Sequence, residues 1–301
     1  MKGGKQIRCS MKGKFKKNFK LKKEKLFKTD ICVIGDYVDF EVIDEHAGVI
    51  HSIDKRENYI SRKAPKIKGS SYRGERLEQI VAANIDNLFV VSSVARPLFN
   101  NKTIDRFLVI GESSYIRTFI IINKTDLDDE NLIDEWAEIY KSIGYKVIKS
   151  SIITGTGMQE LKKLFHGKKN LLWGQSGVGK SSILNKIYAE LDLNIGEISN
   201  YTEKGKHTTV TSIMIETELG TFIIDTPGVR EIAPFGIRKE DLGHYFIEFP
   251  DHSKNCRFNT CIHSHEPGCA VIDAVENGKI SAERYDSYLR ILETIEQDIL
   301  F

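Results

Sequence analysis

Residues 170–182 read NLLWGQSGVGKSS, an apolar run followed by the pattern G-x-x-x-x-G-K-S. The apolar run has the length of a buried strand, and the residues after it have helical spacing. In that context the pattern predicts a phosphate-binding loop, because glycines let backbone N–H groups turn toward phosphates and a helix N-terminus adds a positive dipole end. The residues expected to hold the phosphates are Gly174, Gln175, Ser176, Gly177, Val178, Gly179, Lys180, Ser181 and Ser182.

Two side chains of this loop have distinct expected roles. Lys180 neutralises the β- and γ-phosphates, and the hydroxyl of Ser181 binds Mg²⁺. The alternative is a glycine turn without a ligand, which the flanking strand and helix make the weaker interpretation.

Strands and helices alternate around the loop. Apolar runs typical of buried strands are separated by segments with apolar residues three and four apart, which indicate helices. This alternation predicts a parallel sheet covered on both faces. Residues 210–226 instead read as a hairpin with its turn at Glu218–Gly220. The other expected strands are 87–94, 118–124, 145–151 and 170–174, and the expected helices are 103–112, 130–144, 158–165 and a segment from Lys180 onward.

Residues 123–126 read N-K-T-D and follow the apolar run FIII. At this edge of an open parallel sheet, loops bind ligands. The carboxylate of Asp126 can accept hydrogen bonds from guanine N1–H and N2–H₂, whereas adenine offers no such pair of donors, so GTP and GDP are favoured over ATP. Asn123 is expected to tie loops together, and the stem of Lys124 to lie over the purine. A backbone N–H for guanine O6 is expected at Ser150 or Ser151.

A second phosphate-side motif follows the hairpin. Asp225 and Gly228 belong to D-T-P-G, the expected position for a Mg²⁺-side carboxylate and a glycine that senses the γ-phosphate. In G-K-H-T-T, Thr209 is the expected second Mg²⁺ ligand and Thr208 its rival. Val229 stands where many GTPases have a water-orienting glutamine, so we hypothesise that His207 orders the attacking water instead.

The order of these motifs is unusual. In ordinary G proteins the phosphate loop comes first and N-K-x-D last, but here Asn123 precedes Gly174. Loops at one edge of a sheet form the same site wherever the chain ends are cut, so this order indicates circular permutation.

A cysteine and histidine cluster lies near the C-terminus, with the spacing C-x₄-C-x-H-x₅-C. Three thiolates and one imidazole suit a closed tetrahedral Zn²⁺ site that holds a small segment together. His265 is an alternative to His263 as a ligand, and free buried thiols are the alternative to a metal site. The expected ligands are Cys256, Cys261, His263 and Cys269.

The formal net charge of +2 conceals a strong asymmetry. Residues 1–30 hold twelve Lys and Arg against two acids, a local charge of 12 − 2 = +10, which leaves +2 − 10 = −8 for the rest. Blocks of like charge commonly form disordered tails that bind nucleic acid, although a solubilising tail is the alternative. No secretory signal and no membrane-length apolar run is found. Five cysteines are too few and too unevenly placed for a disulfide scaffold, so a reducing cytoplasm is expected.

Short strand-like runs between Asp30 and about Ala83 suit a small oligonucleotide/oligosaccharide-binding (OB) barrel. A small sandwich or an SH3-like barrel has the same sequence pattern.

The chain resembles one family, the circularly permuted, ribosome small-subunit-dependent GTPases (RsgA, also called YjeQ). The resemblance rests on N-K-x-D, G-Q-S-G-V-G-K-S, G-K-H-T-T, D-T-P-G-V-R-E and the Cys/His cluster in that order, and covers the chain from about Asp30. It implies a Mg²⁺-dependent GTPase of late small (30S) subunit maturation that the subunit stimulates, with ribosomal RNA bound by the barrel and the zinc domain.

The expected fold is therefore multidomain. It comprises a basic disordered arm (1–29), an OB-like β-barrel (30–84), a central α/β circularly permuted P-loop GTPase domain (85–238) and a C-terminal zinc-binding helical domain (239–301). A cytoplasmic monomer with one structural Zn²⁺ is expected. An RNA-binding scaffold with incidental turnover is the competing function, and a metal-delivery GTPase is disfavoured because the Cys/His set leaves no open coordination position.

Overall fold

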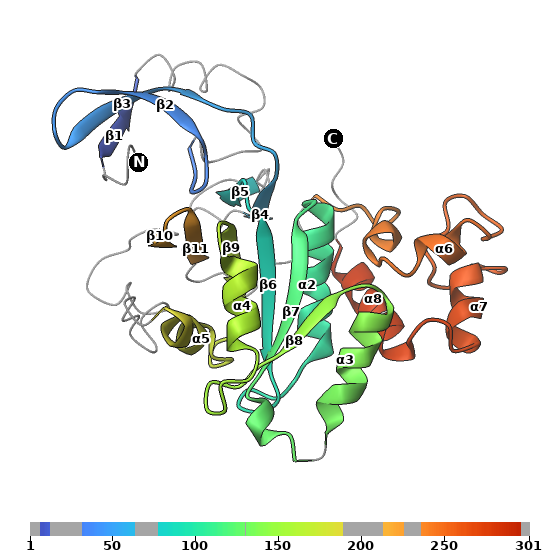
Figure 1. The fold of residues 1–301 in the computed structure, drawn as a ribbon. Coiled ribbons are helices and arrows are strands. Elements are labelled where there is room, and N and C mark those ends of the chain that lie inside the picture. Colours follow the sequence, from blue (N-terminus) through green and yellow to red (C-terminus); the bar gives the residue numbers. More distant parts are fainter. Residues whose placement is uncertain are drawn as a thin grey trace, which may run out of the picture. The chain divides into compact units, whose positions relative to one another are not determined.

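The computed structural model describes residues 7–12, 32–63, 78–129, 131–188, 213–225 and 236–295 (Figure 1). The chain divides into two compact units, Met1–Ile85 and Asp86–Phe301. This division falls one residue from the expected end of the barrel. The C-terminal segment belongs to the same compact unit as the phosphate-binding loop.

A six-stranded sheet forms the centre of the second unit, with strand order β10-β11-β9-β6-β7-β8. Strands β10 and β11 form the expected antiparallel hairpin, and the other neighbouring pairs are parallel. The strands are β6 (Asn87–Ser93), β7 (Arg117–Asn123), β8 (Lys146–Lys149), β9 (Lys169–Trp173), β10 (Ile213–Glu218) and β11 (Thr221–Asp225).

The strand order explains how the permuted sequence builds one site. The chain forms β6, β7 and β8 before β9, yet β9 lies between β11 and β6. Because β6 to β9 and β11 all run parallel, their carboxyl ends lie along one edge of the sheet. The segments that follow β7, β8 and β9 therefore meet at that edge, although they are far apart in the chain.

One face of the sheet is covered by α4 (Met158–Phe165) and α5 (Lys180–Ile187). Phe89 of β6 and Phe119 of β7 are partners in the register of these parallel strands, so both point to this face, with ring centroids 4.9 Å apart. Phe165 of α4 meets Phe89 edge-on at 4.7 Å. Aromatic pairs of this kind pack the core on which the phosphate-binding loop rests.

The opposite face is covered by α2 (Asn101–Ser113) and α3 (Leu132–Ser142). Phe107 of α2 packs against Trp173 at the end of β9, with ring centroids 5.5 Å apart. The side chain of Asn100 caps α2 by accepting the N–H of Thr103. Helix α2 thus starts beside the strand that leads into the phosphate-binding loop.

The C-terminal segment consists of η4 (Leu242–Tyr245), α6 (Pro250–Ser253), α7 (Ala270–Glu276) and α8 (Ala282–Thr294). Phe246, Phe249 and Tyr288 form its aromatic core. Val109 of α2 belongs to the same cluster of buried residues, so this core continues onto helix α2 of the central unit.

The described residues of the first unit form two small sheets. One has the order β1-β3-β2, and the other pairs β4 with β5. Strand β1 runs parallel to β3, and the remaining pairs are antiparallel. The strands are β1 (Arg8–Met11), β2 (Val38–Val42), β3 (Ala47–Ile53), β4 (Tyr59–Lys63) and β5 (Glu78–Ala83).

The expected short strands are present, and within the described residues they form two sheets. One expectation for this unit needs correction. The basic arm is not wholly without structure, because Arg8–Met11 forms β1 and pairs with Ala47–Ile50 of β3. The physical reason is local: residues 6–11 hold a single basic side chain, so like-charge repulsion is weak there and the backbone can pair with the edge of β3.

Candidate functional site

The predicted phosphate-binding loop connects β9 to α5, and its path depends on glycine. Gly177 and Gly179 have φ angles of +84° and +98°, which side chains with a Cβ rarely adopt. A Cβ on Gly174 would lie 2.1 Å from the carbonyl oxygen of Val91 in β6. Helix α5 begins at Lys180, directly after the loop, so its N-terminus faces the site.

Two polar side chains hold the loop in place. The Lys180 ammonium donates to the carbonyl oxygens of Gly174 at 2.8 Å and Gln175 at 3.0 Å. The Asn123 amide, at the end of β7, donates to the carbonyl oxygen of Val178 at 2.9 Å. The N-K-x-D segment and the phosphate-binding loop, separated by about fifty residues in the chain, therefore meet through a buried hydrogen bond.

Lys124 joins three segments at once. It has a left-handed backbone, with φ of +62°. Its ammonium donates to the carbonyl oxygens of Ala95 and Arg96 in the β6–α2 loop and, at 2.7 Å, of Gly177 in the phosphate-binding loop. Partial burial, and then the nearby Arg96 charge, lower the pKa of Lys124 below its ordinary value. The sequence predicted that the aliphatic part of Lys124 covers the purine, but it did not predict these three hydrogen bonds of the ammonium.

The residues expected to recognise the base lie at the ends of β7 and β8. The Ser151 hydroxyl donates to Oδ1 of Asp126, which fixes the orientation of that carboxylate. The Ser150 hydroxyl donates to Oδ1 of Asn123 at 3.1 Å. Asp126 is exposed, so its second oxygen can meet a ligand.

The two backbone N–H groups expected to meet guanine O6 already donate to other residues of the fold. The N–H of Ser150 donates to Ile122 at 2.8 Å, and that of Ser151 donates to Thr156 at 3.1 Å. Both groups are therefore used within the fold. The next N–H along the chain, that of Ile152, has no acceptor within the described residues. Sequence reasoning did not predict these hydrogen bonds, because a motif does not show how a loop pairs within the fold.

Several predicted site residues lie outside the described part. These are His207, Thr208, Thr209 and Gly228, and Asp225 is described only through its backbone as the last residue of β11. Strand β11 is a direct neighbour of β9, so the backbone of Asp225 ends at the same edge as the phosphate-binding loop.

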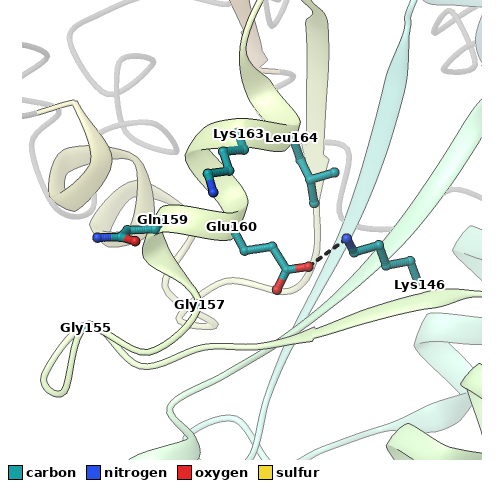
Figure 2. A pocket seen from close by; sticks show the side chains of 7 residues that line it. All are labelled: Lys146, Gly155, Gly157, Gln159, Glu160, Lys163 and Leu164. Atoms are coloured by element: carbon teal, nitrogen blue, oxygen red, sulfur yellow. Dashed lines mark ion pairs between the residues drawn. The ribbon is translucent and has the colours of Figure 1, made fainter.

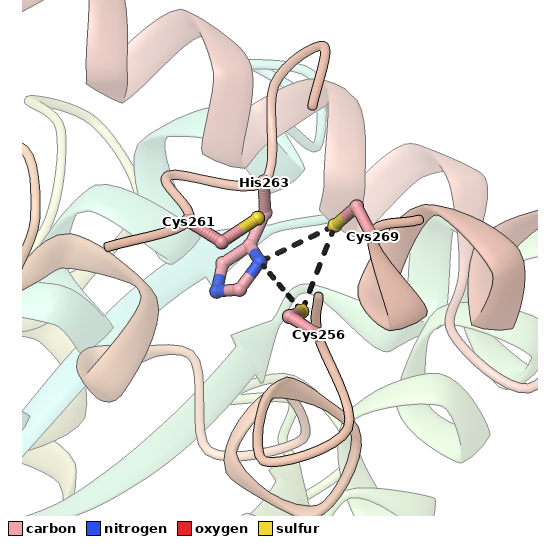
Figure 3. A group of neighbouring side chains, drawn as sticks. All are labelled: Cys256, Cys261, His263 and Cys269. Carbon is pink, nitrogen blue, oxygen red and sulfur yellow. Dashed lines mark hydrogen bonds between the residues drawn. The ribbon is translucent and has the colours of Figure 1, made fainter. Parts of the chain in front are cut away.

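The Cys/His cluster is assembled in the C-terminal segment (Figure 3). All four ligand atoms lie within 4.8 Å of one another. Nδ1 of His263 is 3.4 Å from the Cys269 sulfur and 3.6 Å from the Cys256 sulfur, and these sulfurs are 3.9 Å apart. A tetrahedral Zn²⁺ requires about 3.6 Å between nitrogen and sulfur and about 3.8 Å between sulfurs. The four residues therefore fit a zinc ion.

The rival ligand does not join the cluster. His265 is exposed, and its Nδ1 lies 2.7 Å from the Ser264 hydroxyl. Burial raises the pKa of the Cys261 thiol to about 12 and lowers the pKa of His263 below its ordinary value. A neutral imidazole is the form that binds metal.

The loop that carries His263 is held by groups around the cluster. The Glu266 carboxylate accepts the backbone N–H groups of Ile262 at 2.8 Å and Ser264 at 2.9 Å. Burial opposes its ionisation, but these donors lower the pKa of Glu266 to about 2. The hydroxyl of Tyr285 donates to the His263 carbonyl at 2.8 Å. Such outer contacts orient metal ligands.

A separate pocket of about 660 Å³ lies between β8 and α4 (Figure 2). Figure 2 shows Lys146 of β8 reaching across it to Glu160 of α4, with a nitrogen–oxygen distance of 2.7 Å. Gly155 and Gly157 of the β8–α4 connection also line it, but none of the predicted site residues does. Because the ion pair spans the pocket, we assign it no ligand.

The fold and the site together define a class of protein. A phosphate-binding loop held by an N-K-x-D segment is a feature of P-loop GTPases. Here the strand before N-K-x-D, β7, precedes the strand before the phosphate-binding loop, β9, and both belong to one sheet. This order is that of a circularly permuted P-loop GTPase. Residues 53–234 match the family model described as RsgA GTPase. The match covers more than half of the chain, and the chain therefore belongs to the RsgA GTPase family, so it is a GTPase.

Relatives and solved structures agree with this assignment. A Phocaeicola vulgatus protein named small ribosomal subunit biogenesis GTPase RsgA is 40% identical over 98% of this chain and 92% of its own length. A Chlorobaculum parvum protein of the same name is 37% identical over 89% of this chain and 87% of its own length. The crystal structure of YjeQ from Thermotoga maritima aligns with a TM-score of 0.73 and 33% identity, covering 97% of this chain and 91% of that one. The structure of YloQ, titled a circularly permuted GTPase, aligns with a TM-score of 0.68 and 30% identity. The alignment covers 95% of this chain and 85% of that one.

In the described part, no helix combines the length and the apolar character that a bilayer span needs.

Proposed function

We propose that this chain binds and hydrolyses GTP in the late maturation of the small (30S) ribosomal subunit, and that the subunit stimulates its turnover. One observation carries the proposal. The hydrogen bond from Asn123 to Val178 joins a guanine-type motif to a phosphate-type motif in permuted order, in a chain whose relatives are named for small-subunit biogenesis.

In the proposed nucleotide site, the loop after β9 binds the phosphates and the segments after β7 and β8 bind the base. Residues 174–182 bind the phosphates, with Lys180 at the β- and γ-phosphates. Asp126 accepts hydrogen bonds from guanine N1–H and N2–H₂, and Lys124 covers the purine with its stem. We assign guanine O6 to the N–H of Ile152 rather than to Ser150 or Ser151, because those two N–H groups already donate within the fold.

Mg²⁺ is the second component of the proposed site. Ser181 and Thr209 supply hydroxyl ligands, Asp225 stands on the Mg²⁺ side, and Gly228 contacts the γ-phosphate. When bound, the ion neutralises charge that develops between the β- and γ-phosphates. Ser181 lies in the first turn of α5, where a hydroxyl is close to the phosphate-binding loop.

His207 is proposed to order the attacking water. Replacing it with alanine should lower subunit-stimulated GTP turnover by about 10²-fold or more, the usual contribution of a positioned proton acceptor, while leaving GDP affinity unchanged. Single-turnover hydrolysis with saturating subunits measures this directly. Unchanged turnover would remove His207 from the mechanism.

The C-terminal cluster is proposed to hold one structural Zn²⁺ through Cys256, Cys261, His263 and Cys269, within a zinc-binding segment of residues 239–301. The ion would supply a rigid tetrahedral crosslink with no open position for chemistry. The fit of the sulfur and nitrogen distances supports this assignment.

RNA contact is proposed for the first unit, as an OB-like module, for the zinc segment and for the basic arm. The ribosomal partner implies a cytoplasmic protein, and we propose that it acts as a monomer. The short antiparallel strands of the first unit support the module, and the net charge of the arm supports its contact with phosphates.

The arm can be tested without removing β1. Changing Lys14, Lys16, Lys17, Lys20 and Lys22 to glutamine should weaken subunit binding and flatten its salt dependence, by about 0.7 to 0.9 in the log–log slope for each lysine that contacts a phosphate. The matched control changes five exposed lysines of the second unit to glutamine, which removes the same charge outside the arm and the zinc segment: Lys141, Lys146, Lys162, Lys163 and Lys168. A salt slope equal to that of the wild type would identify the arm as a solubilising tail.

The proposed function is tested by GTP and ATP turnover with and without purified small subunits. We expect hydrolysis selective for GTP and a rate that rises when subunits are added. A Lys180→Ala variant should lose turnover. If subunits leave the rate unchanged, the chain acts as an RNA-binding scaffold with incidental turnover.

A further inference from the structure

The C-terminal helix α8 and the phosphate-binding loop are both attached to the first turns of α2. On the α8 side, Nδ2 of Asn101 lies 3.2 Å from the Ser287 hydroxyl and 3.5 Å from the Glu283 carbonyl oxygen. An ion pair of 3.0 Å joins Lys102 to Asp286 next to these contacts. The N-terminal turn of α2 therefore rests directly on α8.

One turn further along α2 lies a buried ionic network. The Arg284 guanidinium of α8, whose side chain is 1% exposed, donates to the fully buried carboxylate of Asp105 at 2.6 Å. Its other nitrogens donate to Glu248 at 2.8 and 2.9 Å. The Tyr140 hydroxyl of α3 donates to the same oxygen of Asp105 at 2.8 Å.

This ionic network also restricts how α2 and α8 can move against each other. Apolar side chains of similar volume would pack α2 on α8 without the cost of removing charges from water. A shift of the helices would separate Arg284 from Asp105 or Glu248 and leave a buried charge without its partner, which is strongly unfavourable. The contact between α2 and α8 is therefore expected to be rigid.

On its other side, the start of α2 touches the phosphate-binding loop. Nε2 of Gln175 lies 3.4 Å from the Thr103 hydroxyl in the first turn of α2. The loop that precedes α2 packs on the same segment, since a Cβ on Gly177 would lie 3.5 Å from Cδ of Pro97. The ammonium of Lys124 binds that loop and Gly177 together.

We propose that α2 links the C-terminal segment to the nucleotide site, and that Arg284, Asp105 and Ser287 are positioning residues for the phosphate-binding loop. Nucleotide binding stabilises the α2–α8 contact, and the α2–α8 contact strengthens nucleotide binding, because coupling between two sites is reciprocal. This inference rests on the proposed nucleotide site. It gives the C-terminal segment a route to the nucleotide that does not pass through residues 226–235.

The test uses two variants that do not touch the nucleotide site. Ser287→Ala removes the hydroxyl partner of Asn101, and Asp105→Asn keeps the shape of the side chain but weakens its bond to Arg284. Ser113→Ala, at the far end of α2, is the matched control. In the full-length protein we expect both variants to bind fluorescent GDP about fivefold more weakly and the control to bind it as the wild type does.

A second readout separates coupling from a general loss of stability. GDP should slow amide hydrogen exchange in α8 of the wild type, and this protection should be reduced in Ser287→Ala at a temperature where the variant is fully folded. If GDP leaves exchange in α8 unchanged in the wild type, the inference is wrong. Wild-type GDP affinity in both variants would also overturn it.

Failure of the nucleotide site itself gives a different result. If Lys180→Ala binds GDP as tightly as the wild type, the proposed phosphate-binding role is wrong, whatever α8 does. If Lys180→Ala loses GDP while Ser287→Ala and Asp105→Asn keep it, the nucleotide site stands and the α2 link fails.

Discussion

Asp126→Asn is expected to weaken GTP binding by on the order of 10⁴-fold, the size of effect seen when a site built to pair with polar groups of its ligand is mismatched. Guanine presents two donors, N1–H and N2–H₂, to this side chain. The hydroxyl of Ser151 donates to Oδ1 of Asp126, so the amide of the variant should keep its oxygen toward Ser151 and turn its NH₂ toward the base. Two donors would then face each other.

The same geometry predicts that Asp126→Asn gains affinity for a different nucleotide. Xanthine carries an oxygen at position 2, which can accept a hydrogen bond from the new amide, so xanthosine triphosphate should bind the variant better than GTP does. Competition against fluorescent GDP measures both affinities. Asp129→Asn, a nearby exposed carboxylate outside the proposed site, should bind GTP normally. If Asp126→Asn retains full GTP affinity, the base is recognised elsewhere.

Loss of the metal cluster is expected to have the second large effect. Cys269→Ser should abolish Zn²⁺ binding and unfold much of the segment from 239 to 295. The cysteines contribute to the core formed by Phe249, Val271 and Tyr288, and the metal-binding free energy of such sites, about 10–16 kcal/mol, becomes folding free energy. Metal content and the protease resistance of the segment report the two effects.

The choice of histidine is tested in the same assay. His263→Ala should lose the metal as Cys269→Ser does. His265→Ala should retain one Zn²⁺ per chain, because His265 is exposed and directed to Ser264. Cys32→Ser, in the first unit, is the control for a thiol outside the cluster. Retention of metal by His263→Ala would contradict the ligand set.

The α/β part of the fold was predictable because its signals are local. Apolar runs, helical spacing and a glycine pattern each arise within a few residues, and β6 to β11 and α2 to α5 lie where those patterns indicate. The first unit was less predictable. Its strands are short and their pairing is non-local, so the sequence did not distinguish a closed barrel from two small sheets, or reveal that Arg8–Met11 pairs with β3.

The sequence by itself determined the chemistry: a phosphate-binding loop, a guanine-type motif, a zinc-type cluster and a permuted order, since each depends on residue types at set spacings. Only the tertiary structure decided which groups remain available and which are used within the fold. In the structure the N–H groups of Ser150 and Ser151 donate within the fold. His263, and not the exposed His265, lies beside the three cysteines of the cluster. Arg284 is buried against Asp105. The physical reason is that hydrogen-bond partners and burial depend on segments that are distant in the chain, and no spacing records which of them will meet.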